Sequence, residues 1–123
     1  MPDKQKSVKV KRISPRLRVF CGDEVALGPG KIALLMAVAE TGSIREAAER
    51  LDMSYMRAWT LIRTMNRCFE NPVVERVRGG KEGGGAHLTA TGSKVLELYQ
   101  RMERNCLLAI KPEWTLLRNL LRK

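Results

Sequence analysis

The chain has 123 residues, which suits one compact domain with tails. Lys and Arg number 23 against 13 Asp and Glu, so the net charge is +10 and the expected partner is a polyanion. Nucleic acid is the first candidate and an anionic membrane surface the second. No apolar run approaches the roughly 18 residues of a membrane span, and residues 1–6 lack the apolar stretch of a signal peptide. We therefore expect a cytoplasmic protein without membrane association.

Residues that carry enzyme or metal chemistry are few. His87 is the single histidine, and Cys21, Cys68 and Cys106 contain no C-x-x-C pair. These residues predict neither a disulfide framework, a metal site nor a catalytic cluster, so no catalytic residue, metal or cofactor is predicted and the chain is not expected to be an enzyme. The cysteines follow apolar patterns, which favours buried small hydrophobes over redox sensors.

The first third of the chain predicts an arm, a hairpin and a helix. Residues 1–15 are basic and nearly free of apolar side chains, as in a flexible arm. Residues 17–21 and 25–27 flank a Gly22-Asp23-Glu24 turn and indicate two short antiparallel strands. Apolar residues then recur at helical spacing over residues 31–41, and Gly42 follows as the expected stop.

Two further helices are predicted close together. Ser43 and Glu46 match a capping box, in which each side chain accepts a hydrogen bond from the other residue's free backbone N–H, and a short helix follows to about Leu51. Ser54 is placed as the next N-cap, for a third helix over residues 55–69. At 100° per residue, one arc of this helix is apolar. The opposite arc carries Met56, Arg57, Thr60, Arg63, Thr64 and Arg67.

The remainder predicts a second hairpin and a long helix. Residues 73–78 and 86–88 indicate strands around a glycine-rich loop, residues 79–85. Thr89 is placed to cap a helix over residues 90–110, followed by a short amphipathic tail over residues 111–123. Residues on this helix repeat at heptad-like spacing and predict a dimer interface at Val95, Tyr99, Met102 and Cys106.

These elements together predict a mainly α protein with a small β component, a winged helix-turn-helix over residues 16–89 with an N-terminal hairpin and a long C-terminal dimerisation helix. The third helix would enter the major groove, where Arg57 and Arg63 read guanine edges and Thr60, Thr64 and Met56 contact other bases. The loop lacks the order of a nucleotide-binding loop and suits a wing tip on the backbone or minor groove. The predicted DNA-binding residues are Ser54, Tyr55, Met56, Arg57, Thr60, Arg63, Thr64, Arg67, Arg76, Arg78 and Lys81. Tyr55 and Arg67 are assigned to phosphates, and Trp59 to helix packing.

Several motifs also resemble a known family, the ModE-type molybdate-responsive transcriptional regulators, whose DNA-binding domains are of the LysR-like winged-helix class. The resemblance covers about residues 16–110. It rests on Glu40-Thr41-Gly42-Ser43-Ile44, on Met53-Ser54-Tyr55 with Ala58-Trp59, on Val74-Glu75-Arg76, on Gly79-Gly80-Lys81-Glu82-Gly83-Gly84-Gly85-Ala86, and on Leu88-Thr89 with Gly92.

The resemblance implies a homodimeric bacterial regulator that binds double-stranded DNA at the operator of a molybdate-uptake operon. Members of the family hold molybdate in C-terminal modules, whereas about a dozen residues follow the last predicted helix here. We therefore expect the DNA-binding part to stand alone and molybdate, possible as a ligand only from the resemblance, to have little direct effect. The alternatives are a molybdate or other oxyanion carrier and a small basic RNA-binding protein.

Overall fold

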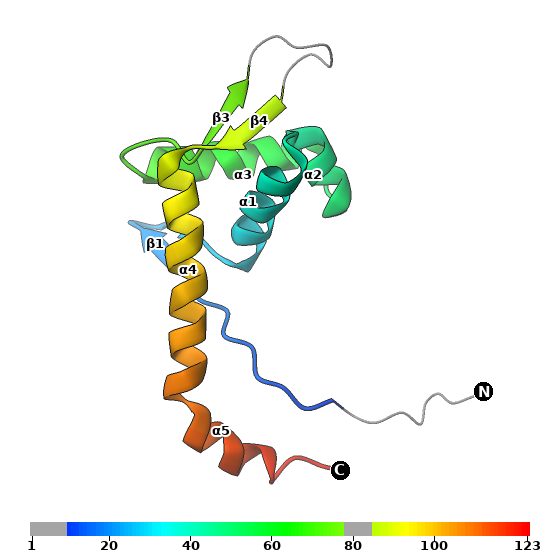
Figure 1. Cartoon of the computed structure of the whole chain (residues 1–123), viewed down its shortest axis with the longest axis vertical. Helices are drawn as coiled ribbons and strands as arrows, with labels where there is room; N and C mark the ends of the chain where they lie inside the picture. The colour runs from blue at the N-terminus through cyan, green and yellow to red at the C-terminus, as the bar shows by residue number, and fades with distance from the viewer. Residues whose placement is uncertain (1–9, 78–84) are drawn as a thin grey trace, which may run out of the picture.

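The computed structural model describes residues 10–77 and 85–123, and it confirms the predicted fold class (Figure 1). Helices predominate, and two separate two-stranded antiparallel sheets accompany them. The elements in chain order are β1 (Val19–Cys21), β2 (Glu24–Leu27), α1 (Pro29–Thr41), α2 (Ile44–Arg50), α3 (Tyr55–Cys68), β3 (Val74–Val77), β4 (Gly85–Leu88), α4 (Ala90–Ala109) and α5 (Lys111–Arg118).

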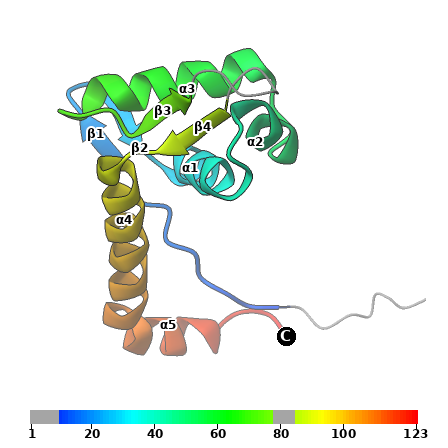
Figure 2. The same ribbon diagram turned by 45° about the horizontal axis from the view of Figure 1, so that its top comes forward.

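The hydrophobic core lies where α1, α2 and α3 meet the two hairpins (Figure 2). Its largest fully buried side chains include Leu34, Leu35 and Val38 of α1 and Ile62 and Met65 of α3. In α3 these residues share the predicted apolar arc, so burial of that arc holds the helix with its basic side outward. No buried polar or charged residue occurs in this core among the described residues.

Local capping explains where the first two helices begin and end. Gly42 adopts φ 71°, the left-handed conformation that ends α1, and its N–H donates to the Val38 carbonyl. The Ser43 hydroxyl accepts from the Glu46 N–H at 3.1 Å, as predicted for the start of α2. The other half of the predicted capping box is replaced, because the Ser43 N–H donates to Thr41 Oγ1 at 3.2 Å.

The second hairpin is anchored to the turn between α1 and α2. Val74 pairs with Leu88 and Val77 with Gly85, so Gly85 belongs to β4 and not to the predicted loop. The Ala86 N–H donates to the Gly42 carbonyl at 2.9 Å. A Cβ at Gly85 would lie 2.6 Å from that same oxygen, so a glycine is required for the close approach.

Helix α4 begins against the segment before β3 and then extends away from the compact part formed by α1, α2, α3 and the two hairpins, here called the head (Figure 1). The Thr89 hydroxyl accepts from the Gly92 N–H at 3.0 Å, which confirms the predicted cap. Gly92 itself packs on Val73, because a Cβ there would lie 2.0 Å from the Val73 carbonyl oxygen. A glycine at this position therefore sets how closely α4 starts beside β3.

The predicted dimer seam on α4 is wrong at Tyr99. This side chain is 1% exposed and belongs to the chain's own core, and its hydroxyl donates to the Leu17 carbonyl at 2.7 Å. Val95 is half-buried against the same core. Heptad spacing alone did not distinguish the face of α4 that packs on its own chain from the face that points away.

Beyond this contact, α4 and α5 expose large apolar side chains. Leu98 and Met102 of α4 are 40% and 42% exposed, and Leu116 and Leu117 of α5 are 70% and 52% exposed. No helix of the described residues is both long enough and apolar enough to cross a membrane. The predicted amphipathic tail contains the short helix α5, and none of the residues of this helix is buried within one chain.

Candidate nucleic-acid interface

The exposed face of α3 starts from a fixed helix end. The Ser54 hydroxyl accepts from the Arg57 N–H at 3.0 Å, so the residue predicted at the N-cap holds the first turn. Met56, Arg57, Thr60 and Arg63 are all exposed on the first three turns, and Met56 is 66% exposed. The structure therefore brings these predicted DNA-binding residues onto one surface. A rigid helix with a buried opposite face presents them together.

The two threonines of this helix differ in how accessible their side chains are to a binding partner. The Thr60 hydroxyl donates to the Met56 carbonyl at 3.0 Å, which leaves its oxygen lone pairs facing outward as acceptors. Thr64 lies one turn further on and is half-buried. Its access to a partner is therefore smaller than that of Thr60.

A cluster of aromatic rings and guanidinium groups joins α2, α3 and β3. Trp59 carries the Arg76 guanidinium 4.9 Å and the Arg63 guanidinium 5.9 Å from its ring centre. Arg45 of α2 lies 4.8 Å above the Tyr55 ring, and Tyr55 meets Trp59 edge to face at 6.5 Å between ring centres. Cation–π contact of this kind holds a positive group in place while its remaining N–H donors stay available. These five residues are the aromatic–arginine cluster.

Hydrogen bonding within the aromatic–arginine cluster polarises Tyr55. Hydrogen bonding by Trp59, followed by that of Arg76, lowers the pKa of the Tyr55 hydroxyl below its ordinary value. The Arg76 guanidinium donates to this oxygen at 3.0 Å. The wing strand β3 and the first turn of α3 are therefore linked by a charged hydrogen bond as well as by the stacked ring.

Asn66 ties the start of β3 to α3. Its side-chain oxygen accepts from the Val73 N–H at 2.7 Å and from the Val74 N–H at 3.3 Å. Its side-chain nitrogen donates to the Val74 carbonyl at 3.2 Å. These contacts satisfy backbone groups at the start of β3. They also fix the strand that carries Arg76 towards Trp59.

The far end of α3 is arranged differently. The Arg67 guanidinium donates to Glu24 Oε2 at 2.6 Å, so the residue assigned to a phosphate is paired with a carboxylate of β2. This hydrogen bond from Arg67 lowers the pKa of Glu24. Arg78 and Lys81, which were predicted to lie on the wing, are outside the described residues.

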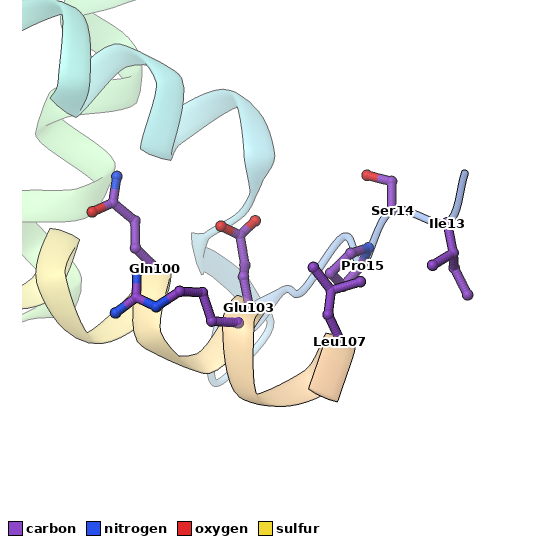
Figure 3. A pocket seen from close by; sticks show the side chains of 7 residues that line it. Ile13, Ser14, Pro15, Gln100, Glu103 and Leu107 are labelled. Atoms are coloured by element: carbon purple, nitrogen blue, oxygen red, sulfur yellow. The ribbon is translucent and has the colours of Figure 1, made fainter. Parts of the chain in front are cut away.

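A concave region lies away from α3, between the N-terminal segment and α4 (Figure 3). It is open and mixed in character, because apolar residues lie beside one acidic and one basic side chain. Its lining residues are Ile13, Ser14, Pro15, Gln100, Glu103, Arg104 and Leu107. Among the described residues, no group of three or more His, Cys, Asp or Glu side chains is placed to hold a metal ion.

The sequence patterns missed three contributors to this surface. Arg45 lies on a helix that was given only a supporting role, and Trp59 was assigned to packing alone. Trp59 does pack against the core, yet its ring also carries two guanidinium groups. Asn66 falls between the two arcs of α3. The i, i+4 spacing of Trp59 and Arg63 was the one signal in the sequence that pointed to such stacking.

Comparison with known proteins assigns this arrangement to a family. The pattern described as "Bacterial regulatory helix-turn-helix protein, lysR family" matches residues 30–93. The Yersinia pestis protein "Transcriptional regulator ModE" is 48% identical over 71 residues, which are 58% of this chain and 27% of that protein. The Azotobacter vinelandii "Molybdenum transport protein ModE" is 42% identical over 78 residues, which are 63% of this chain and 29% of that protein. The chain thus spans under a third of the length of these relatives.

Solved structures agree with the fold. A crystal structure of a CbnR_DBD-DNA complex has a TM-score of 0.52 and 25% identity, and the match covers 76% of this chain and 97% of that one. ArgP from Mycobacterium tuberculosis has a TM-score of 0.50 and 28% identity, with 70% of this chain and 31% of that one covered. The family description is that of a regulatory protein, which agrees with the prediction that the chain is not an enzyme. The chain therefore belongs to the lysR family of bacterial regulatory helix-turn-helix proteins, with ModE-type regulators among its relatives.

Proposed function

We propose that this chain is a transcriptional regulator that places α3 in the major groove of double-stranded DNA and its β3–β4 wing on the adjacent backbone. The observation that carries the proposal is the exposed face of α3 with the aromatic–arginine cluster beside it. Guanidinium groups that are already held on aromatic rings lose less conformational entropy when they bind DNA than freely moving ones do. The net charge of +10 supplies the long-range attraction to phosphate.

The roles follow from position on this surface. Arg57 and Arg63 read guanine edges, and Thr60 and Met56 contact neighbouring bases. Tyr55 and Arg76 lie where α3 meets the wing and contact phosphates. Arg67 engages phosphate only by leaving Glu24, so its contribution is the smaller one.

The relatives named as ModE support a more specific role. One is called a transcriptional regulator and another a molybdenum transport protein. The DNA site of this chain is accordingly an operator of a molybdate-uptake operon, and the chain acts in the bacterial cytoplasm. We expect molybdate and sulfate to change the DNA affinity of this chain equally.

A homodimer is the assembly that fits the exposed apolar residues of α4 and α5. With Tyr99 buried, the seam moves to the side of α4 that carries Leu98 and Met102, with Cys106 half-buried further along the helix. Two such helices would place the two copies of α3 about one DNA turn, roughly 34 to 36 Å, or more apart. Sedimentation of the full chain tests this, with Met102→Glu expected to give monomers and Arg122→Ala to leave the dimer intact. A wild-type chain that stays monomeric on DNA overturns it.

Titration of labelled duplex with wild-type and variant chains tests DNA recognition. Arg57→Ala and Arg63→Ala should each cost about 1 to 3 kcal/mol of binding and relax preference at one base pair. Arg122→Ala removes the same charge beyond α5 and should change affinity only slightly. Each phosphate contact that is lost should reduce the slope of log K against log salt by about 0.9.

The same titration separates the competing functions. Preference for RNA of matched sequence would indicate a small RNA-binding protein, and saturable molybdate binding without duplex binding would indicate an oxyanion carrier. An unchanged ranking of duplexes in both arginine variants contradicts the assigned base contacts. Absence of duplex binding even at low salt contradicts the proposal as a whole.

A further inference from the structure

Two of the cysteines lie together at the end of α3, although they are far apart in sequence. Cys21 of β1 pairs with Glu24 of β2, and residues directly opposite in an antiparallel pair project from the same face. The Cys68 thiol, at the last residue of α3, donates to Glu24 Oε1 at 3.6 Å. The Cys21 thiol is also close enough to Cys68 to be, after burial, a cause of the raised pKa of the Cys68 thiol. Cys21 and Cys68 thus form a thiol pair beside one carboxylate.

The two thiols differ in access. Cys21 is exposed, contrary to the prediction of a buried small hydrophobe, and Cys68 is half-buried. Burial, followed by the neighbouring Cys21 thiol and the Glu24 carboxylate, raises the pKa of the Cys68 thiol. Because the thiolate is the reactive form, Cys68 is a poor first nucleophile, and the exposed Cys21 meets a reagent from solution first.

We propose that Cys21 and Cys68 are a modification site at which a small disulfide such as oxidised glutathione converts the pair into an intramolecular disulfide. The Cys21 thiolate attacks one sulfur of the reagent, forms a mixed disulfide and releases one glutathione thiolate. The Cys68 thiolate then attacks the Cys21 sulfur and releases the second glutathione. In balance, the protein dithiol loses two electrons and two protons, and one oxidised glutathione becomes two reduced molecules.

The bond would tie the β1–β2 hairpin to the end of α3 and close a loop that contains α1, α2 and most of α3. Closing a long loop stabilises the fold chiefly by restricting the unfolded chain. The proposed DNA-reading residues, from Met56 to Arg63, lie about 8 to 18 Å from Cys68 along the axis of the same helix, at about 1.5 Å rise per residue. Oxidation should therefore raise thermal stability and leave duplex affinity within about threefold.

The experiment equilibrates the full chain carrying Cys106→Ser, which removes the third thiol, with mixtures of reduced and oxidised glutathione. Peptide mapping should find one bond, between the peptides with Cys21 and Cys68. The effective concentration of the two thiols should be at least about 100-fold higher in the native chain than in the same chain unfolded by guanidinium. The melting temperature should rise by more than about 5 °C and return on reduction.

Cys21→Ser and Cys68→Ser, each added to the chain with Cys106→Ser, are the matched controls and should show no such rise with the same reagent. Equal effective concentrations in the native and unfolded chain would overturn the proposal. So would a wild-type chain that pairs Cys106 with either partner or forms intermolecular dimers by disulfide bonds. None of these measurements depends on DNA, so the proposal stands or falls separately from the proposed function.

Discussion

Replacement of Gly92 by alanine tests how α4 is joined to the head. The new Cβ would lie 2.0 Å from the Val73 carbonyl oxygen and 2.9 Å from its carbonyl carbon. Both atoms belong to backbone, so α4 or the segment before β3 must move by more than about 1 Å to restore ordinary contact. That movement disturbs two hydrogen bonds of Thr89, one from its N–H to Val73 O at 3.0 Å and one from its hydroxyl to Pro72 O at 2.6 Å.

The magnitude follows from three opposing contributions. Overpacking in a close contact typically costs about 1 to 3 kcal/mol. Each disturbed hydrogen bond contributes about 1 kcal/mol, and the better helix propensity of alanine returns about 1 kcal/mol. We therefore expect Gly92→Ala to lower the free energy of unfolding by about 2 to 4 kcal/mol, a large part of the stability of a small domain.

Urea denaturation followed by circular dichroism measures this change, with Gly30→Ala as the matched control. Gly30 also lies in the first turn of a helix, but a Cβ there meets nothing within 4 Å. Its replacement should stabilise the chain by up to about 1 kcal/mol through helix propensity. Equal effects of the two substitutions, or a Gly92→Ala chain as stable as the wild type, would refute the steric argument.

Three further predictions concern the core, the DNA surface and pH. Tyr99→Phe removes a hydrogen bond to a backbone carbonyl and should lower the free energy of unfolding by about 1 kcal/mol, measured by urea denaturation. Trp59→Leu keeps an apolar side chain but removes the ring, so duplex affinity should fall, and its effect should not add to that of Arg76→Ala in the double variant. The lowered pKa of Glu24 means that its pairing with Arg67 stabilises the fold above the unfolded-state pKa near 4 and is lost as pH falls through the lower folded-state value. Glu24→Gln should therefore weaken the fall in melting temperature below about pH 4.

Each of these predictions has an opposing outcome. A Tyr99→Phe chain that changes its sedimentation but not its stability would return Tyr99 to a dimer interface. Strictly additive effects of the Trp59 and Arg76 substitutions would mean that the ring does not hold the guanidinium for DNA. An unchanged acid profile in Glu24→Gln would mean that its exposed ion pair is too weakly coupled to folding to matter.

The sequence by itself determined the elements whose signals are local. Spacing of apolar residues along α3 separated its buried face from its basic face before any packing was known. Ser54, Thr89 and Gly42 marked helix ends because a capping side chain or a left-handed residue acts within one turn of its own position. These features were sufficient to predict a winged helix-turn-helix and most of its exposed basic residues.

Tertiary structure alone decided the contacts between segments distant in sequence. Whether Tyr99 faces its own chain depends on where α4 leaves Val73, which is set by the absence of a side chain at Gly92. The meeting of Arg76 with Trp59, and of Cys21 with Cys68, depends in the same way on how the hairpins dock on α3. Periodicity reports that a face is apolar or polar, but not which surface it meets, because the partner is supplied by packing and not by neighbours along the chain.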